Sequence, residues 1–180
     1  MKHTNTAAVS PVVGVMLMLV VVIIIAAVVS AFAGGLTAAK DKSPTVTIRG
    51  TYSQANGMTV EHLGGSSIAT MDTIVTVRPT KTFGNAEHMV WVVNKSMITD
   101  ATGDNTKAWT RAEGYSGTKS FSPGDKAYIL PPKHHNNMLQ VGSTSTYYFD
   151  SSANVGKTFW LEFSDTAGRV FARTEVTIVP

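Results

Sequence analysis

The chain begins with a long uncharged run, and this run constrains the fold more than any other feature. Residues 4–39 contain no Asp, Glu, Lys or Arg, and residues 9–33 read VSPVVGVMLMLVVVIIIAAVVSAFA. At ~1.5 Å per residue, a helix from Pro11 to Ala33 measures about 35 Å, which is enough to cross a hydrocarbon core of ~30 Å. Apolar residues lie on all its sides, so no single face is marked for burial against a soluble core. The apolar core of a secretory signal is shorter, and the run therefore predicts a helix that stays on the mature protein.

The sequence also marks the ends of this helix. Ser10 is the expected N-cap, Pro11 suits the first helical position, and Gly34-Gly35 is expected to end the helix and act as a hinge. Small residues spaced four apart let helix backbones approach closely, although small residues are also simply common in apolar helices. The residues expected to serve helix packing are Gly14, Ala26, Ala27, Ser30 and Ala31.

The block AVSPVVGVMLMLVVVIIIAAVVSAFAGG, Ala8 to Gly35, resembles the N-terminal region of archaeal type IV pilins. Looser likenesses follow at VEHLGGSSI (60–68), FSPGDKAYIL (121–130) and FWLEFSDTAGRVFARTEVTI (159–178). The resemblance implies a precursor inserted in the membrane with its leader in the cytoplasm. A prepilin peptidase would cut between Ala8 and Val9, and the mature subunits would then polymerise with one another through their helices into an extracellular filament.

We expect three parts: a cleavable leader at 1–8, the helix and hinge at 9–43, and an extracellular head domain at 44–180. The head alternates apolar and polar residues over short segments, which predicts an α+β chain with an antiparallel, Ig-like β-sandwich head. Asn56-Gly57 predicts a hairpin, and residues 165–168 predict another turn. The expected strands are 45–52, 58–63, 72–79, 88–94, 126–130, 145–149, 157–164 and 169–178.

A polar insertion, residues 99–117, interrupts this pattern and is expected to be a loop at the filament surface. Trp109 and Tyr115 lie within it, so we expect these two aromatic side chains to be exposed. The other aromatic residues of the head are expected to pack within the core or across strands.

No catalytic motif, cofactor site or complete metal site is expected, and the chain is not expected to be an enzyme. His134-His135, with His62 or His88, offers too few ligands at defined spacing for zinc, and a solvated loop is the preferred reading. Residues 100–105 offer oxygen atoms for calcium but lack the closing glutamate of a calcium loop. Asn94-Lys95-Ser96 is a sequon, so Asn94 is a possible N-glycosylation site.

Charge and cysteine content narrow the functional classes. The formal net charge is only +3 and the basic residues form no run, so nucleic-acid binding is not predicted. There are no cysteines and hence no disulfide framework. We expect a structural filament subunit that begins in the cell membrane and ends at the cell surface. The alternative is a membrane-anchored ectodomain, or a minor pilin, that acts in recognition or solute binding without polymerising.

Overall fold

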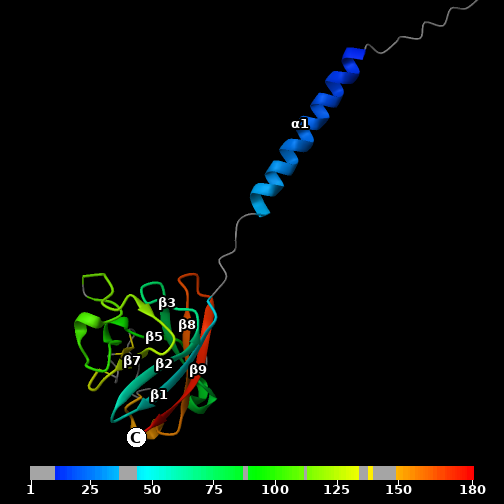
Figure 1. Cartoon of the computed structure of the whole chain (residues 1–180). Helices are drawn as coiled ribbons and strands as arrows, with labels where there is room; N and C mark the ends of the chain where they lie inside the picture. Colours follow the sequence, from blue (N-terminus) through cyan, green and yellow to red (C-terminus); the bar gives the residue numbers. More distant parts are fainter. Residues whose placement is uncertain (1–10, 37–43, 87–88, 112, 134–137, 140–148) are drawn as a thin grey trace, which may run out of the picture. The chain divides into compact units, whose positions relative to one another are not determined.

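The computed structural model describes residues 11–36, 44–86, 89–111, 113–133, 138–139 and 149–180 (Figure 1). The chain divides into two compact units, Met1–Lys42 and Ser43–Pro180. The first contains a single described helix, α1 (Pro11–Leu36), and the second is the β-rich head.

Helix α1 begins at Pro11, as the fixed φ and missing N–H of proline predict. It runs to Leu36 and so includes Gly34 and Gly35, which were expected to end it. The predicted end at Ala33 is therefore three residues short. Glycine weakens a helix by about 1 kcal/mol relative to alanine but does not forbid it, so the helical backbone continues through the pair. That Gly34 and Gly35 act as a hinge remains a prediction.

The head is built from short strands and 3₁₀ turns. As predicted, Asn56-Gly57 closes the hairpin between the first two strands. Gly57 has φ +91°, and a Cβ there would lie 2.2 Å from the Ile129 carbonyl oxygen. The strands are β1 (Val46–Ser53), β2 (Gly57–Gly65), β3 (Ile68–Ala69), β4 (Ile74–Pro79), β5 (Trp91–Val92), β6 (Ser120–Phe121), β7 (Lys126–Ile129), β8 (Thr158–Ser164) and β9 (Val170–Val179). The 3₁₀ helices are η1 (Lys81–Ala86), η2 (Lys95–Met97), η3 (Asn105–Lys107) and η6 (Ser152–Asn154).

The α+β class with one apolar helix and a β head is confirmed, and the strand arrangement adds detail. Among the described residues of the head, seven strands form one sheet in the order β5-β4-β8-β9-β1-β2-β7, and β3 and β6 form a separate pair. The sheet curls rather than splitting into two separate sheets. Beyond β5, the chain reaches the opposite edge, where Thr99 and Tyr128 exchange two backbone hydrogen bonds of 2.8 Å. Neighbouring strands are antiparallel except β1 and β9, which pair in parallel at Tyr52 and Ile178.

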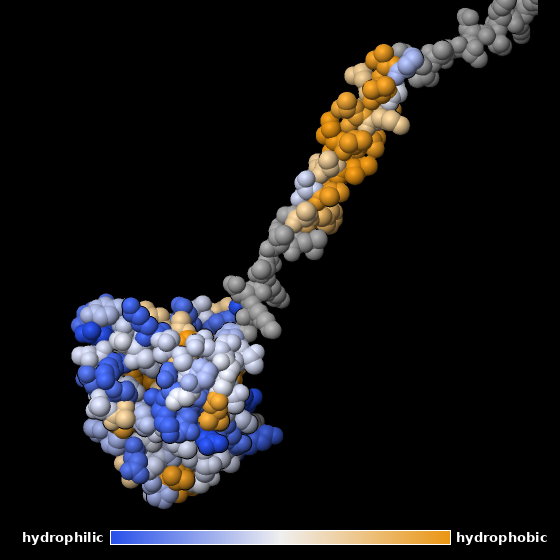
Figure 2. All heavy atoms as spheres, in the orientation of Figure 1, coloured by the Kyte–Doolittle hydropathy of each residue, from blue (hydrophilic) through white to orange (hydrophobic). Residues whose placement is uncertain are grey.

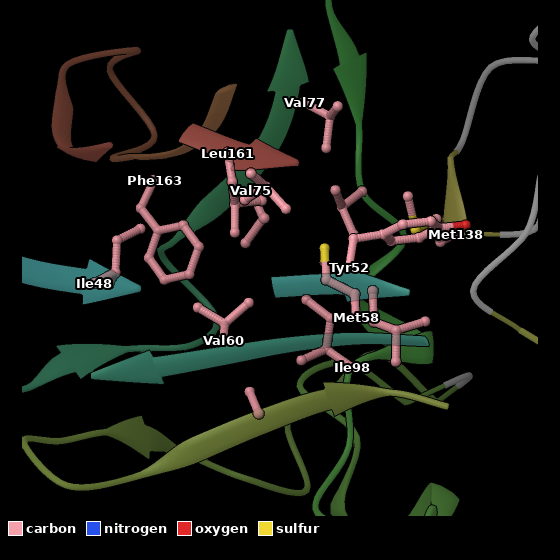
Figure 3. Packing of buried hydrophobic residues seen from close by; sticks show 14 of the residues in the cluster. Ile48, Tyr52, Met58, Val60, Val75, Val77, Ile98, Met138, Leu161 and Phe163 are labelled. Carbon is pink, nitrogen blue, oxygen red and sulfur yellow. The ribbon is translucent and has the colours of Figure 1, made fainter. Parts of the chain in front are cut away.

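The concave side of this sheet holds the hydrophobic core. Figure 3 shows Val75 and Leu161, from β4 and β8, facing Ile48 and Val60, from β1 and β2. All four are at most 6% exposed, and burying such a side chain contributes about 1.5–3 kcal/mol. Gly50 of β1 lies against this core, where a Cβ would come within 2.6 Å of Val176 Cγ2. A larger residue at this position would therefore clash with the core.

The polar insertion is the clearest departure from the sequence prediction. Tyr115 is 50% exposed, as expected, but Trp109 is 2% exposed and belongs to the core. Its indole packs against Phe121 and Phe163, with ring centroids 5.3 and 5.9 Å away. The prediction for Trp109 was wrong because it was based on the polar neighbours of this residue. Burial of a large aromatic side chain is strongly favourable, and Trp109 packs in the core although the residues around it in the sequence are polar. Of the expected strands, residues 145–148 lie outside the described part, and only Trp91–Val92 of 88–94 is a strand.

Candidate functional site

The surface of α1 is the candidate functional site because its large apolar side chains from Val12 to Phe32 are all exposed. Their exposure ranges from 43% at Val21 to 75% at Met18, and Figure 2 shows an almost unbroken apolar surface on the visible side. The segment Pro11–Ala33 is long and apolar enough to cross a membrane. Exposure of so many apolar side chains to water is unfavourable. Such a helix is therefore stable only where lipid or other helices surround it.

Small residues occur on two opposite sides of this helix. At 100° per residue, Ala26, Ala27, Ser30 and Ala31 cover one continuous arc, whereas Gly14 projects from nearly the opposite side, about three turns earlier. All five are exposed, and a Cβ added at Gly14 meets no atom within 4 Å. The helix therefore offers two places where another backbone can approach closely, and they face different directions.

The expected cleavage residues Ala8 and Val9, and the expected N-cap Ser10, lie outside the described residues. They remain predictions. Pro11, directly after them, is the first residue of α1.

Asn94 lies in a tightly held turn of the head. Its Oδ1 accepts hydrogen bonds from Ser96 N (3.1 Å) and Ser96 Oγ (2.8 Å), and its backbone N–H donates to Met138 O. Lys95 Nζ donates to Thr70 O and Met71 O, and burial lowers the pKa of this lysine. These bonds fix the amide plane of Asn94, which is half-buried. Occupancy by a glycan remains a prediction.

The possible metal ligands are used by other groups or lie outside the described residues. His62 is 1% exposed, and its Nε2 lies 3.0 Å from Ser66 O, whereas His88, His134 and His135 are not described. Lys107 Nζ lies 2.7 Å from Asp100 Oδ2, so an ammonium group occupies the place of a cation. Together with Thr102, it lowers the pKa of Asp100 to about 2. Within the described ranges, no group of three or more His, Cys, Asp or Glu could hold a metal ion.

A family match was found for the segment that contains α1. Residues 7–48 match the model of the family described as archaeal type IV pilin, N-terminal. This segment is therefore similar to the N-terminal domain of archaeal type IV pilins. The pilin match covers α1 and ends at Ile48, within β1, and it points to a structural protein. The search of curated proteins returned no match.

The sequence reasoning missed one feature of the head, a groove on the outer side of the sheet beside Trp160. The available signal was the alternation of β8, which turns Phe159 and Leu161 inward and hence directs a large indole outward. A tryptophan at an outward position is unusual enough to mark a surface for attention.

Proposed function

We propose that this chain is the structural subunit of an extracellular type IV pilus-like filament. The α1 helices form the filament core and the β heads form the outer surface. The observation that carries the proposal is the helix, apolar and exposed on all sides, inside the segment that matches the pilin family. A helix that only docked onto its own head would need one apolar face, whereas a helix surrounded first by lipid and then by copies of itself needs apolar residues all round.

The proposal includes a maturation step. The precursor stays in the cell membrane with residues 1–8 on the cytoplasmic side, and a prepilin peptidase cuts between Ala8 and Val9. The helix and hinge (9–43) then leave the bilayer for the filament, and the head (44–180) remains outside the cell. In this transfer the helix exchanges lipid contacts for helix contacts, so dispersion and close packing drive it rather than the hydrophobic effect.

The alternative is a membrane-anchored ectodomain or a minor pilin that does not polymerise. A single-span anchor requires only length and apolarity, and it gains nothing from small residues on two sides. The small residues between Ala26 and Ala31 lie on one side of the helix and Gly14 lies on the other. This arrangement favours a helix with neighbours in more than one direction.

Two substitutions distinguish a filament core from an anchor. Ala27→Ile adds bulk inside the small arc, and Val29→Ile adds bulk where a large residue already stands. Both keep the helix apolar, so both precursors should insert in the membrane and be cleaved. We expect the Ala27→Ile strain to lose surface filaments and the Val29→Ile strain to keep them.

The measurement is electron microscopy of sheared surface material, with N-terminal sequencing of its protein. Filaments whose subunit begins at Val9 are expected from the parent strain. Full-length subunits in filaments would contradict the processing step. Normal filaments from the Ala27→Ile strain would contradict the packing argument, and cleaved protein that never leaves the membrane would favour the anchor.

A further inference from the structure

A groove of about 500 Å³ lies on the outer face of the sheet, where β4 ends and β8 begins. The strand register places Arg78 of β4 opposite Trp160 of β8, and Trp160 opposite Glu175 of β9. Neighbouring strands are ~4.8 Å apart, so the arginine and the glutamate flank the indole at a separation of about 10 Å. The groove thus has an aromatic centre with a cation on one side and a carboxylate on the other.

The charged groups around Trp160 are held in place before any ligand arrives. The guanidinium of Arg173 lies 3.8 Å from the centre of the Trp160 ring. Below it, the Glu162 carboxylate is 7% exposed and lies 3.3 Å from Arg173 Nε and 3.6 Å from Arg78 Nε. Side chains fixed in this way lose little conformational entropy when they bind, which is the usual mark of a preorganised site.

Hydroxyl groups and a lysine form the end of the groove. Thr80 Oγ1 lies 2.7 Å from Thr158 Oγ1 and 2.8 Å from Thr82 Oγ1. Lys81 stands between these threonines in the chain and is exposed, so its ammonium group is available to a ligand. This end therefore offers hydroxyls at fixed spacing beside an exposed positive charge.

The balance of charges indicates the kind of ligand. Arg78, Lys81 and Arg173 outnumber Glu162 and Glu175, and Glu162 is already neutralised between two arginines. A neutral sugar would leave the charge of Lys81 and the one excess positive charge of the Arg78, Glu162 and Arg173 group without a counterion. A polyphosphate chain would place charge against Glu175, which repels it but accepts hydrogen bonds from sugar hydroxyls.

We propose that this groove binds an acidic saccharide, with a uronate carboxylate at Arg78 and Lys81, a pyranose ring against the face of Trp160 that Arg173 does not cover, and sugar hydroxyls at Glu175. A volume of about 500 Å³ accommodates one or two sugar rings, because small-molecule sites commonly enclose ~300–1,000 Å³. The indole offers an apolar surface to the C–H face of the sugar ring. The cations orient the carboxylate and favour acidic over neutral sugars.

The test uses the full chain in a nonionic detergent without a sugar headgroup. Isothermal titration with a galacturonate trimer at low salt should give saturable binding that weakens as salt is added. Lys81→Glu should weaken it at least about fivefold, since it replaces an attraction by a repulsion at an exposed site. Lys119→Glu makes the same change of charge at an exposed lysine outside the groove and should leave binding unchanged.

Three further results decide the ligand class. A galactose trimer should not bind, and Trp160→Ala should abolish uronate binding while circular dichroism shows an intact β fold. If Trp160→Ala does not fold, the Lys81→Glu and Lys119→Glu pair still decides. Equal losses in that pair, or no binding by the parent chain, would overturn the proposal. Tighter binding of a short single-stranded DNA of equal charge would overturn the assignment to acidic sugars.

Discussion

Burial of Trp109 makes a quantitative prediction about the stability of the head. Replacing it with alanine removes an indole that is 2% exposed and packs against Phe121 and Phe163. Loss of a buried large aromatic side chain costs about 3–5 kcal/mol, because the transfer free energy is lost and a cavity remains. With a urea dependence of about 2 kcal/mol per molar, the midpoint of unfolding should fall by roughly 2 M.

Tyr115→Ala is the matched control, since it removes an aromatic ring from the same insertion. Tyr115 is 50% exposed, and the Arg111 guanidinium lies 4.7 Å from the centre of its ring. An exposed cation–π contact contributes about 0.5–1 kcal/mol, so the midpoint should move by no more than ~0.5 M. The assay is urea denaturation of the full chain in detergent, followed by far-ultraviolet circular dichroism. Equal shifts for the two variants would show that the insertion is the surface loop that the sequence predicts.

Three other predictions follow from the head. Gly50→Ala should destabilise it by about 1–3 kcal/mol in the same denaturation assay, because the new methyl group meets Val176 at 2.6 Å. The folded-state pKa of Asp100 is lowered from 3.8 to about 2, so its contribution to stability is present above pH ~4 and is lost as the pH falls towards 2. Lys107→Met should move this pKa back towards 3.8 in an NMR titration, because the lysine hydrogen bond is its largest cause. A fragment of residues 44–180 should unfold cooperatively and remain monomeric in analytical ultracentrifugation, because it has its own core but lacks α1.

Each of these has an outcome that contradicts it. Thr51→Ala, an exposed neighbour on β1, should change stability by less than ~0.5 kcal/mol, and an equal loss at both positions would refute the overpacking argument at Gly50. An Asp100 pKa unmoved by Lys107→Met would refute the ion pair. Filaments formed by the fragment would refute the assignment of assembly to the helix.

Local patterns predicted most of the elements of this chain. Alternation and β-branched residues located β1, β2, β4, β8 and β9 to within a few residues, because strands of a half-buried sheet carry their periodicity in their own sequence. The hairpin at Asn56-Gly57 followed from backbone conformation alone. The start of α1 at Pro11 followed in the same way.

Long-range arrangement could not be predicted in this way. The parallel contact between Tyr52 and Ile178, the closure through Thr99 and Tyr128, and the pairing of β3 with β6 join segments distant in sequence, and no local pattern specifies them. Burial of Trp109 depends on the same closure. The groove beside Trp160 needs three strands in register before its residues become neighbours. The candidate site on α1 could be predicted from the sequence. A segment that is apolar on all sides requires apolar surroundings, and this requirement does not depend on the rest of the chain.

The position of β1 in the sheet has a mechanical consequence. β1 is the first strand of the head in the chain, yet it is an interior strand with β9 on one side and β2 on the other. It pairs with β2 along its whole length, from Val46 opposite Gly65 to Ser53 opposite Gly57. When an object attached to the head pulls against an anchored helix, the tension enters the domain through this strand. A load along β1 is resisted in shear by all these hydrogen bonds together, whereas an edge strand could be peeled away one bond at a time.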